Sequence, residues 1–166
     1  MSHIWRCESP LGGIILTSDG QFLTGLRFDP RKDPASSPPP EHGEKKLPVF
    51  EETLRWLALY FSGRDPGFTP ALKMQTTEFR KTVWQILLTI PYGQTATYGE
   101  IASEVALLKG LPRMSAQAVG GAVGHNDIAL IIPCHRVIGA DGSLTGYAGG
   151  LGRKKELLAM ERAGTR

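Results

Sequence analysis

The sequence predicts an α+β protein built from two small units, with strands at the start of the chain and helices through most of the rest. Three observations support this fold class. Short β-rich runs separated by turn residues occupy the first 28 positions, apolar residues recur at helical spacing from Phe50 onward, and the composition changes at residues 29–48 and again at 70–77. A chain of 166 residues is long enough for two small domains. We therefore predict one unit over residues 1–72 and a second over residues 73–166.

The first unit begins with three predicted strands, which are Trp5–Ser9, Ile14–Thr17 and Phe22–Phe28. The segments between them contain Pro10-Leu11-Gly12-Gly13 and Ser18-Asp19-Gly20, which are mostly of the types that form turns. Strands joined by such short turns pair as an antiparallel meander.

A surface loop is predicted at residues 30–48, because this stretch is rich in Pro, Ser and charged residues. After it, apolar residues recur at the spacing of one helix face from Phe50 to Phe61, and Ser62-Gly63 ends that helix. Nothing in this α+β unit points to chemistry.

The second unit opens with two predicted helices. The first has an apolar stripe over residues 79–90 and is stopped by Pro91. Thr97 and Glu100 have the spacing of a capping box, in which each side chain accepts from the backbone amide of the other residue. A second helix therefore starts at this point, and Gly110-Leu111-Pro112 ends it.

A third helix is predicted from Ala116 to about Gly124, with Ser115 as its cap. Two helices joined by a turn have the order of a DNA-reading helix-turn-helix. The third helix consists largely of Ala and Gly, although each Gly costs about 1 kcal/mol of helix stability relative to Ala. Such a smooth helix suits close approach to another backbone. Against DNA it suits the minor groove, where little sequence can be read.

Charge is distributed unevenly between the two units. Up to Leu72 there are 8 Lys and Arg against 9 Asp and Glu, and from Lys73 onward there are 11 against 7. The positive excess lies in the second unit, which favours that unit as the docking surface for an anionic polymer.

The composition also narrows the class of protein. Hydrophobic residues make up 41% and charged residues 21% of the chain, an ordinary globular balance. No apolar run approaches the roughly 20 residues of a membrane helix, and residues 1–6 lack a signal-peptide stretch. We expect a cytoplasmic protein that does not bind membranes.

The two cysteines, Cys7 and Cys134, are too few for a disulfide framework or a four-cysteine zinc site, so we expect free thiols and no metal. His3 and Cys7 could contribute to one metal site, but two unrelated strand residues is the simpler interpretation.

Cys134 is the candidate nucleophile of the chain. The apolar run Ile128–Ile132, interpreted as a buried strand or a tightly packed extended segment, delivers Pro133-Cys134-His135-Arg136. A thiolate is the reactive form of cysteine, and a neighbouring imidazole and a helix N-terminus both favour it. On a strand, adjacent side chains point to opposite faces, so we expect His135 to reach the sulfur through a water or a turn. The alternative is that Cys134 is only a small buried apolar residue.

The motif Pro133-Cys134-His135-Arg136-Val137 resembles the active-site motif of the O6-alkylguanine-DNA alkyltransferases, the methylated-DNA–protein-cysteine S-methyltransferase family. The resemblance extends over nearly the whole chain. It includes the recognition helix, the asparagine hinge, the substrate-pocket loop and the N-terminal strand pair, at Ala118–Ala122, Asn126, Gly146–Leu151 and Ser9–Gly12.

This resemblance implies an RNase H-like first domain and a winged helix-turn-helix second domain. It implies DNA repair by a single, stoichiometric transfer of an alkyl group from O6 of guanine, or O4 of thymine, after base flipping. The acceptor would be Cys134, with His135 as its base acting through a water, Glu161 orienting the imidazole and Asn126 holding the turn. No cofactor is implied.

Further roles follow from the same resemblance. Tyr98 would contact the phosphate behind the flipped nucleotide and help protonate the departing base. Tyr147 would form a wall of the pocket, and the backbone amide of Ala148 would lie at O6 of the guanine. The carbonyls of Cys134 and Val137 would accept hydrogen bonds from the exocyclic amine of the guanine.

The partner implied is double-stranded DNA bearing O6-alkylguanine, bound by a monomer through the minor groove with little sequence preference. The residues expected at the DNA are Ser115, Gln117, Ala118, Gly120 and Gly121. Gln117 departs from the family pattern, because well-known members have an arginine there that fills the space of the extruded base. We expect Gln117 to take this role with a weaker hold on DNA. The stretch from Tyr98 to Gln117 is also longer than in some relatives, which weakens the assignment of Tyr98.

Three other functions remain open on the sequence. A non-catalytic lesion sensor would lack the acceptor cysteine, which is present here. A cysteine hydrolase would turn over on esters or amides, and adjacent Cys and His suit it poorly. A transcription regulator would read sequence and need no reactive thiol. Arg153, Lys154 and Lys155 are interpreted as the solvated start of the last helix.

Overall fold

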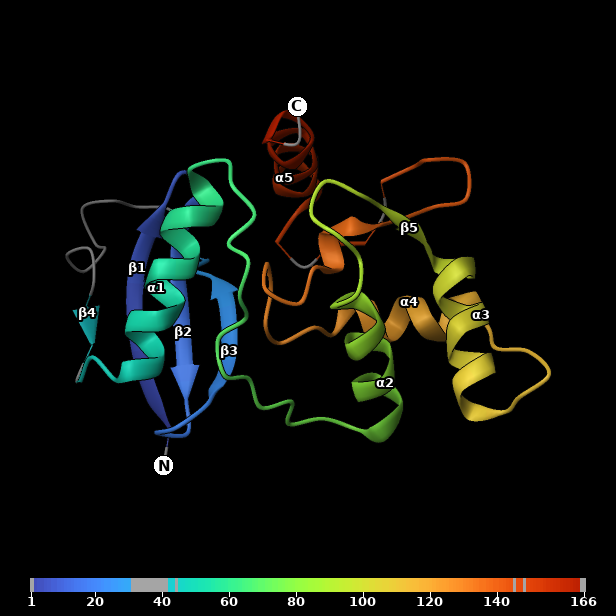
Figure 1. Ribbon diagram of the computed structural model, residues 1–166, viewed down its shortest axis with the longest axis horizontal. Helices are drawn as coiled ribbons and strands as arrows, with labels where there is room; N and C mark the ends of the chain where they lie inside the picture. The colour runs from blue at the N-terminus through green and yellow to red at the C-terminus, as the bar shows by residue number, and fades with distance from the viewer. Residues whose placement is uncertain (1, 31–41, 44, 145, 148, 165–166) are drawn as a thin grey trace. The chain divides into compact units, whose positions relative to one another are not determined.

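The computed structural model describes residues 2–30, 42–43, 45–144, 146–147 and 149–164. The chain divides into two compact units, Met1–Gln75 and Thr76–Arg166 (Figure 1). No helix in the described part of the chain is both long enough and apolar enough to span a membrane.

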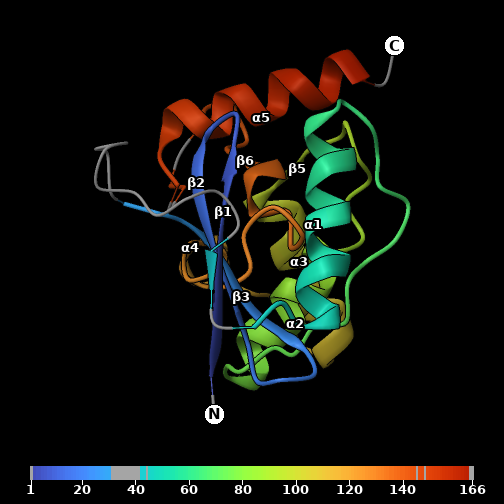
Figure 2. The ribbon, with the colours of Figure 1, turned by 90° about the vertical axis from the view of Figure 1, so that its left-hand side faces the viewer.

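The first unit is a four-stranded sheet covered by one helix. Strands β1 (His3–Ser9), β2 (Gly12–Ser18) and β3 (Leu23–Phe28) form the predicted antiparallel meander, and the sheet order is β3-β2-β1-β4. Helix α1 (Pro48–Phe61) lies along this sheet in both views (Figures 1 and 2). Its buried Phe50 ring lies 6.4 Å from the ring of Trp5 on β1, so the core of this unit forms between the helix and the sheet.

One expectation for this unit changes. The predicted loop contains a short strand, β4 (His42–Gly43), which pairs with Trp5 and Arg6 of β1, while residues 31–41 and 44 lie outside the described residues. A shared site for His3 and Cys7 is not supported, because four residues along β1 correspond to about 13 Å. One ion cannot bridge that distance.

The second unit is built from α2 (Glu78–Leu87), α3 (Tyr98–Lys109), α4 (Ala116–Gly124) and α5 (Leu151–Gly164). Helices α2, α3 and α4 pack on one another. The indole of Trp84 on α2 is fully buried and donates to the carbonyl of Ala122 on α4 at 2.9 Å. This bond holds the third predicted helix against the first.

Local signals set the helix ends in this unit. The capping box of Thr97 and Glu100 is present at the start of α3, and the Ser115 hydroxyl caps α4. Gly110 adopts a left-handed conformation, with φ of 65°, and closes α3. Two short parallel strands, β5 (Ala96–Thr97) and β6 (Val137–Ile138), then connect the start of α3 to the segment after Cys134.

The apolar run Ile128–Ile132 is not a strand. It is buried but folds as consecutive turns, and Leu130 has a positive φ of 69°. The Asn126 side chain explains this conformation, since it accepts from the amide of Ile128 at 3.0 Å and donates to the carbonyl of Ile132 at 2.8 Å. One side chain thus ties both ends of the run together, which an apolar pattern cannot reveal.

Candidate active site

Cys134 lies at the start of a single turn of 3-10 helix, η2 (Cys134–Arg136), between the Ile128–Ile132 turns and β6. The expected alternation of a strand therefore does not apply to Cys134 and His135. All three residues of η2 are buried, and the cysteine is only 5% exposed. Its amide donates to the carbonyl of Ile132 at 2.8 Å, so the position of the thiol depends on the Asn126-tied turns.

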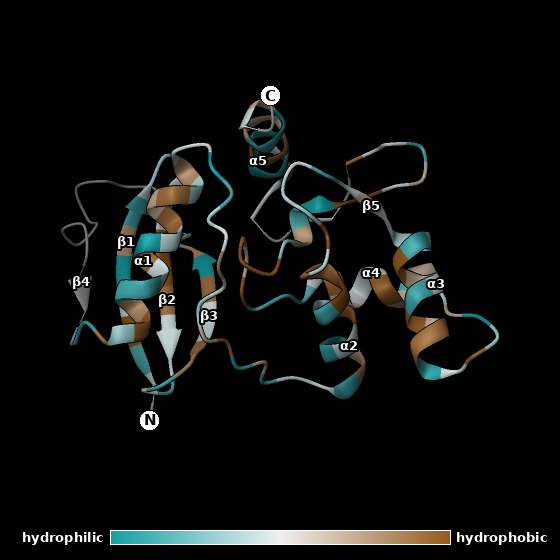
Figure 3. Ribbon diagram, in the orientation of Figure 1, coloured by the Kyte–Doolittle hydropathy of each residue, from teal (hydrophilic) through white to brown (hydrophobic). Residues whose placement is uncertain are grey.

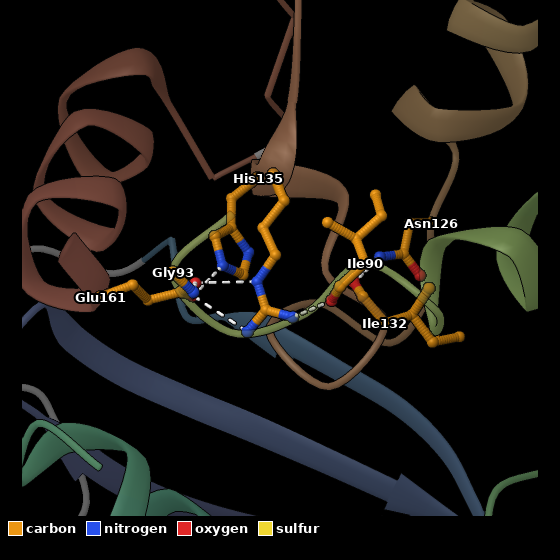
Figure 4. Close-up of polar contacts among 7 residues, drawn as sticks. Ile90, Gly93, Asn126, Ile132, His135 and Glu161 are labelled. Carbon is orange, nitrogen blue, oxygen red and sulfur yellow. Dashed lines mark hydrogen bonds and ion pairs between the residues drawn. The ribbon is translucent and has the colours of Figure 1, made fainter. Parts of the chain in front are cut away.

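His135 forms a buried contact with Glu161, which lies on α5. Its Nε2 atom is 2.5 Å from Glu161 Oε2 (Figure 4). Arg136 binds the same carboxylate through Nε at 2.8 Å and through a terminal nitrogen at 3.2 Å, and the amide of Gly93 donates to it at 3.0 Å. Arg136 also donates to the carbonyl of Ile90 at 2.7 Å. A single carboxylate thus joins η2, α5 and the turn after α2.

The charges of this group follow from its contacts. Burial alone would raise the pKa of Glu161, but the hydrogen bonds and charges of His135 and Arg136 lower it to about 2. Burial lowers the pKa of His135 in spite of the carboxylate. A neutral imidazole beside an ionised carboxylate carries its proton on Nε2, which leaves the lone pair on Nδ1. The imidazole is therefore oriented as a base.

The thiol itself is protonated at neutral pH. Burial raises the pKa of Cys134 to about 11, although the amide of Asn126 and the charge of Lys154 act in the opposite direction. We expected the imidazole and the helix start to favour the thiolate, but in this site desolvation outweighs them. Nucleophilic chemistry at this sulfur requires a base to remove the proton.

Lys154 is not solvated, contrary to our expectation for the start of the last helix. It is fully buried on α5, and its ammonium donates to the carbonyl of Val137 at 2.6 Å. Burial lowers its pKa. Arg153 is half-buried and Lys155 is exposed, so the helix turns only the middle residue of this run inward.

A cavity of about 620 Å³ lies in the second unit, and Tyr147 in its wall is the residue that connects it to His135. Its lining combines α3, α4 and the loop before α5, and the residues are Tyr98, Ala116, Gln117, Gly120, Gly124, Gly146 and Tyr147. Tyr147 is buried, and among the described residues its hydroxyl has no hydrogen-bond partner. Its ring centroid lies 6.4 Å from that of His135. The cavity therefore has a buried donor in its wall.

Tyr98 is the first residue of α3 and is half-buried at this cavity. A methyl group added at Gly120 would lie 3.8 Å from its ring, and one added at Gly146 would lie 3.9 Å from its hydroxyl. Small residues on both sides thus leave room for the tyrosine. Ala148 lies outside the described residues.

Helix α4 presents an uncharged, small-residue surface. Val119, Ala122 and Val123 face the core, whereas the residues turned outward are Ala116, Gln117, Ala118, Gly121 and Gly124. A methyl group added at Gly121 or Gly124 would meet no described atom within 4 Å. Packing within the described chain therefore does not explain why these positions are glycine.

Sequence reasoning missed three contributors to the site. Arg136 lies within the cysteine motif but has no role there until its contact with Glu161 is known. Gly93 and Lys154 carry no signal at all, because both act on residues at least 17 positions away. Among the described residues, no three His, Cys, Asp or Glu side chains are grouped as around a metal ion.

Two family models match the chain. Residues 6–74 match the ribonuclease-like domain of 6-O-methylguanine DNA methyltransferase, and residues 78–163 match its DNA-binding domain. Methylated-DNA–protein-cysteine methyltransferases from Mycobacterium tuberculosis and Mycobacterium leprae are 43% and 46% identical to the chain. Each comparison covers 98% of this chain and 94% or 93% of the relative.

Solved structures agree with these relatives. The O6-methylguanine methyltransferase of Mycobacterium tuberculosis superimposes with a TM-score of 0.80 at 42% identity, covering 98% of this chain and 94% of that one. A structure of the Mycobacterium tuberculosis OGT in complex with DNA gives a TM-score of 0.79 at 41% identity, covering 96% and 92%.

Proposed function

This chain belongs to the 6-O-methylguanine DNA methyltransferase family, and we propose that Cys134 is the sulfur that receives the alkyl group. The protein repairs DNA by direct reversal of alkylation, and each molecule acts once. Its fold is a ribonuclease-like domain followed by a DNA-binding domain, as the sequence predicted. The observation that carries the assignment to Cys134 is its burial beside an imidazole whose other nitrogen is held by a carboxylate.

The reaction begins with removal of the thiol proton. The Nδ1 atom of His135 accepts it through a bridging water, and Glu161 and Arg136 hold the imidazole in place for this step. The thiolate then attacks the alkyl carbon, so that a sulfur–carbon bond forms as the carbon–O6 bond breaks. The bonding electrons go to the guanine, and Tyr98 supplies or directs the proton that leaves guanine neutral. The product is a thioether, which no group in the site can cleave.

The flipped guanine is held by two backbone carbonyls, each of which already accepts one hydrogen bond within the protein. The carbonyl of Cys134 accepts from the amide of Val137, and the carbonyl of Val137 accepts from Lys154. Because a carbonyl oxygen has two lone pairs, each can accept one more hydrogen bond from the exocyclic amine. Tyr147 forms part of the wall of the cavity, and its hydroxyl, which has no partner among the described residues, offers a donor to the base.

Duplex DNA binds along the outer face of α4, in the minor groove and with little sequence preference. The support is that this face carries no charged side chain and, apart from Gln117, only Ala and Gly, and that a methyl group at Gly121 or Gly124 would meet no described atom within 4 Å. The Ser115 hydroxyl accepts from the amides of Gln117 and Ala118 at 3.1 and 3.2 Å. Ser115 therefore holds the first turn of α4, the end of the helix that lies at the DNA, in place. Gln117 at the cavity takes the space of the extruded base.

The protein acts as a monomer in the cytoplasm, where both buried cysteines stay reduced.

The experiment is an intact-mass measurement after incubation with excess duplex carrying O6-methylguanine. We expect one methyl group per chain on the wild type and none on Cys134→Ala, with the lesion lost from the DNA only in the first case. An unchanged mass with the lesion still present would instead identify a lesion sensor. An unchanged mass with the lesion removed would indicate turnover by another mechanism.

A further inference from the structure

The last turn of α3 and the loop after it form an exposed segment of unusual composition. Every residue from 107 to 113 is exposed, and we call this segment the connector. It contains three leucines, Leu107, Leu108 and Leu111, that are 81%, 67% and 43% exposed. In Figure 3 the apolar colour of α3 extends to this end of the helix. Clustered exposed leucines indicate a contact surface, because single ones are normally scattered.

The connector is held in a defined shape. The amide of Leu111 donates to the carbonyl of Ala106 at 2.8 Å, and the amide of Gly110 donates to the carbonyl of Leu107 at 3.3 Å. With Gly110 in the left-handed conformation, these bonds form a Schellman cap. The cap explains an apolar residue at Leu111, because the residue at this position of the motif commonly contacts the last turn of the helix, but it requires nothing apolar at Leu107 or Leu108.

A groove of about 370 Å³ runs from the connector to the helix that faces DNA. It lies between α3 and the loop, and its lining includes Ala106, Leu107, Leu111, Arg113 and Ala116. Ala116, the first residue of α4, lines this groove and the cavity with Tyr98 and Gln117 as well. The groove is therefore continuous with the DNA-facing surface of the proposed function.

The charge of the connector also fits DNA. Lys109 and Arg113 are both exposed, and the segment contains no acidic residue. Helix α4, in contrast, carries no charged residue over Ala116–Gly124. A protein whose recognition helix is neutral obtains its charged phosphate contacts from neighbouring elements.

We propose that the connector is a second DNA-binding element, in which Lys109 and Arg113 bind phosphates and the leucines lie against the sugars and base edges of the minor groove. Proteins that bind the minor groove commonly place apolar side chains against or between base steps. This inference rests on the proposed function and adds a binding element to it. A second copy of the chain is the other conceivable occupant, but the shared wall with the cavity and the paired cations favour DNA.

The test compares two double variants with the wild type on an unmodified duplex just long enough for one protein molecule. Lys109→Gln with Arg113→Gln should make the negative slope of log affinity against log salt concentration less steep by about two, one for each lost phosphate contact. Leu107→Ser with Leu108→Ser should weaken binding by at least about tenfold with an unchanged salt slope. Lys45→Gln and Leu88→Ser, at exposed positions elsewhere, are the matched controls.

Two further readouts separate the possible failures. Reaction of Cys134 with the free base O6-methylguanine, which needs no DNA, should stay at the wild-type rate in both double variants. Unchanged duplex affinity in both variants would overturn the inference, and so would a loss confined to self-association on long DNA. Either result leaves the proposed function intact if the wild type still takes the methyl group from duplex DNA.

Discussion

Replacing Glu161 with Gln tests the group that orients His135. The substitution keeps the size of the side chain but removes a charge that accepts hydrogen bonds from His135, Arg136 and the amide of Gly93. It leaves the buried guanidinium of Arg136 without a counter-charge, which costs about 3–5 kcal/mol of unfolding free energy at neutral pH. The imidazole also loses its fixed orientation. Because a positioned base contributes about 10²–10⁴-fold, we expect methyl transfer to slow by about a hundredfold.

The pH dependence of unfolding gives a second estimate of how much the Glu161 carboxylate contributes to stability. The pKa of Glu161 falls from 4.5 to about 2 in the folded protein. A carboxyl group whose pKa is lowered by folding stabilises the protein above its unfolded pKa, and the effect disappears as the pH falls through the folded value. The shift corresponds to about 3 kcal/mol, lost between about pH 4.5 and pH 2. The difference in stability between the wild type and Glu161→Gln should therefore shrink over this range.

Urea unfolding from pH 2 to pH 7 measures the stability, and single-turnover methyl transfer measures the rate. Glu156→Gln is the matched control, because it makes the same change at an exposed position of α5. The reasoning is refuted if Glu161→Gln has the acid dependence of the wild type, or if its transfer rate equals that of the Glu156 variant.

Three further predictions concern the thiol and the DNA-facing helix. Lys154→Met should raise the pKa of Cys134 above about 11 and slow the alkylation of this thiol by iodoacetamide at fixed pH. Lys154→Arg, which keeps the charge, should react faster than the Met variant, and equal rates in the two variants would exclude an electrostatic role of Lys154. Gln117→Arg should bind duplex DNA more tightly, with a salt slope steeper by about one, as measured by fluorescence anisotropy; no gain would remove the role given to Gln117. Gly121→Leu should leave stability unchanged or raise it by up to about 1 kcal/mol, because the position is exposed and a Cβ there meets no described atom within 4 Å, yet it should weaken duplex binding at least tenfold. Tight binding by this variant would contradict the minor-groove proposal.

Local features of this protein could be predicted from the sequence because they depend on neighbours in the chain. The capping box at Thr97 and Glu100 needs only two residues three positions apart, and the structure contains it. The meander of β1 to β3 likewise follows from short turns between β-rich runs. The cysteine motif was also sufficient to indicate the family, which the comparisons confirm.

Other features depended on residues that are distant in the sequence. The pairing of His135 with Glu161 across 26 positions, and the burial of Lys154 against Val137, arise only when α5 packs on η2. The turns at Ile128–Ile132 depend on a single amide that ties their ends. The sequence alone thus determined which side chains the protein can use and where its helices begin. The tertiary structure decided the burial of those side chains and so the protonation of Cys134, because desolvation depends on everything packed around a group and not on its neighbours in the chain.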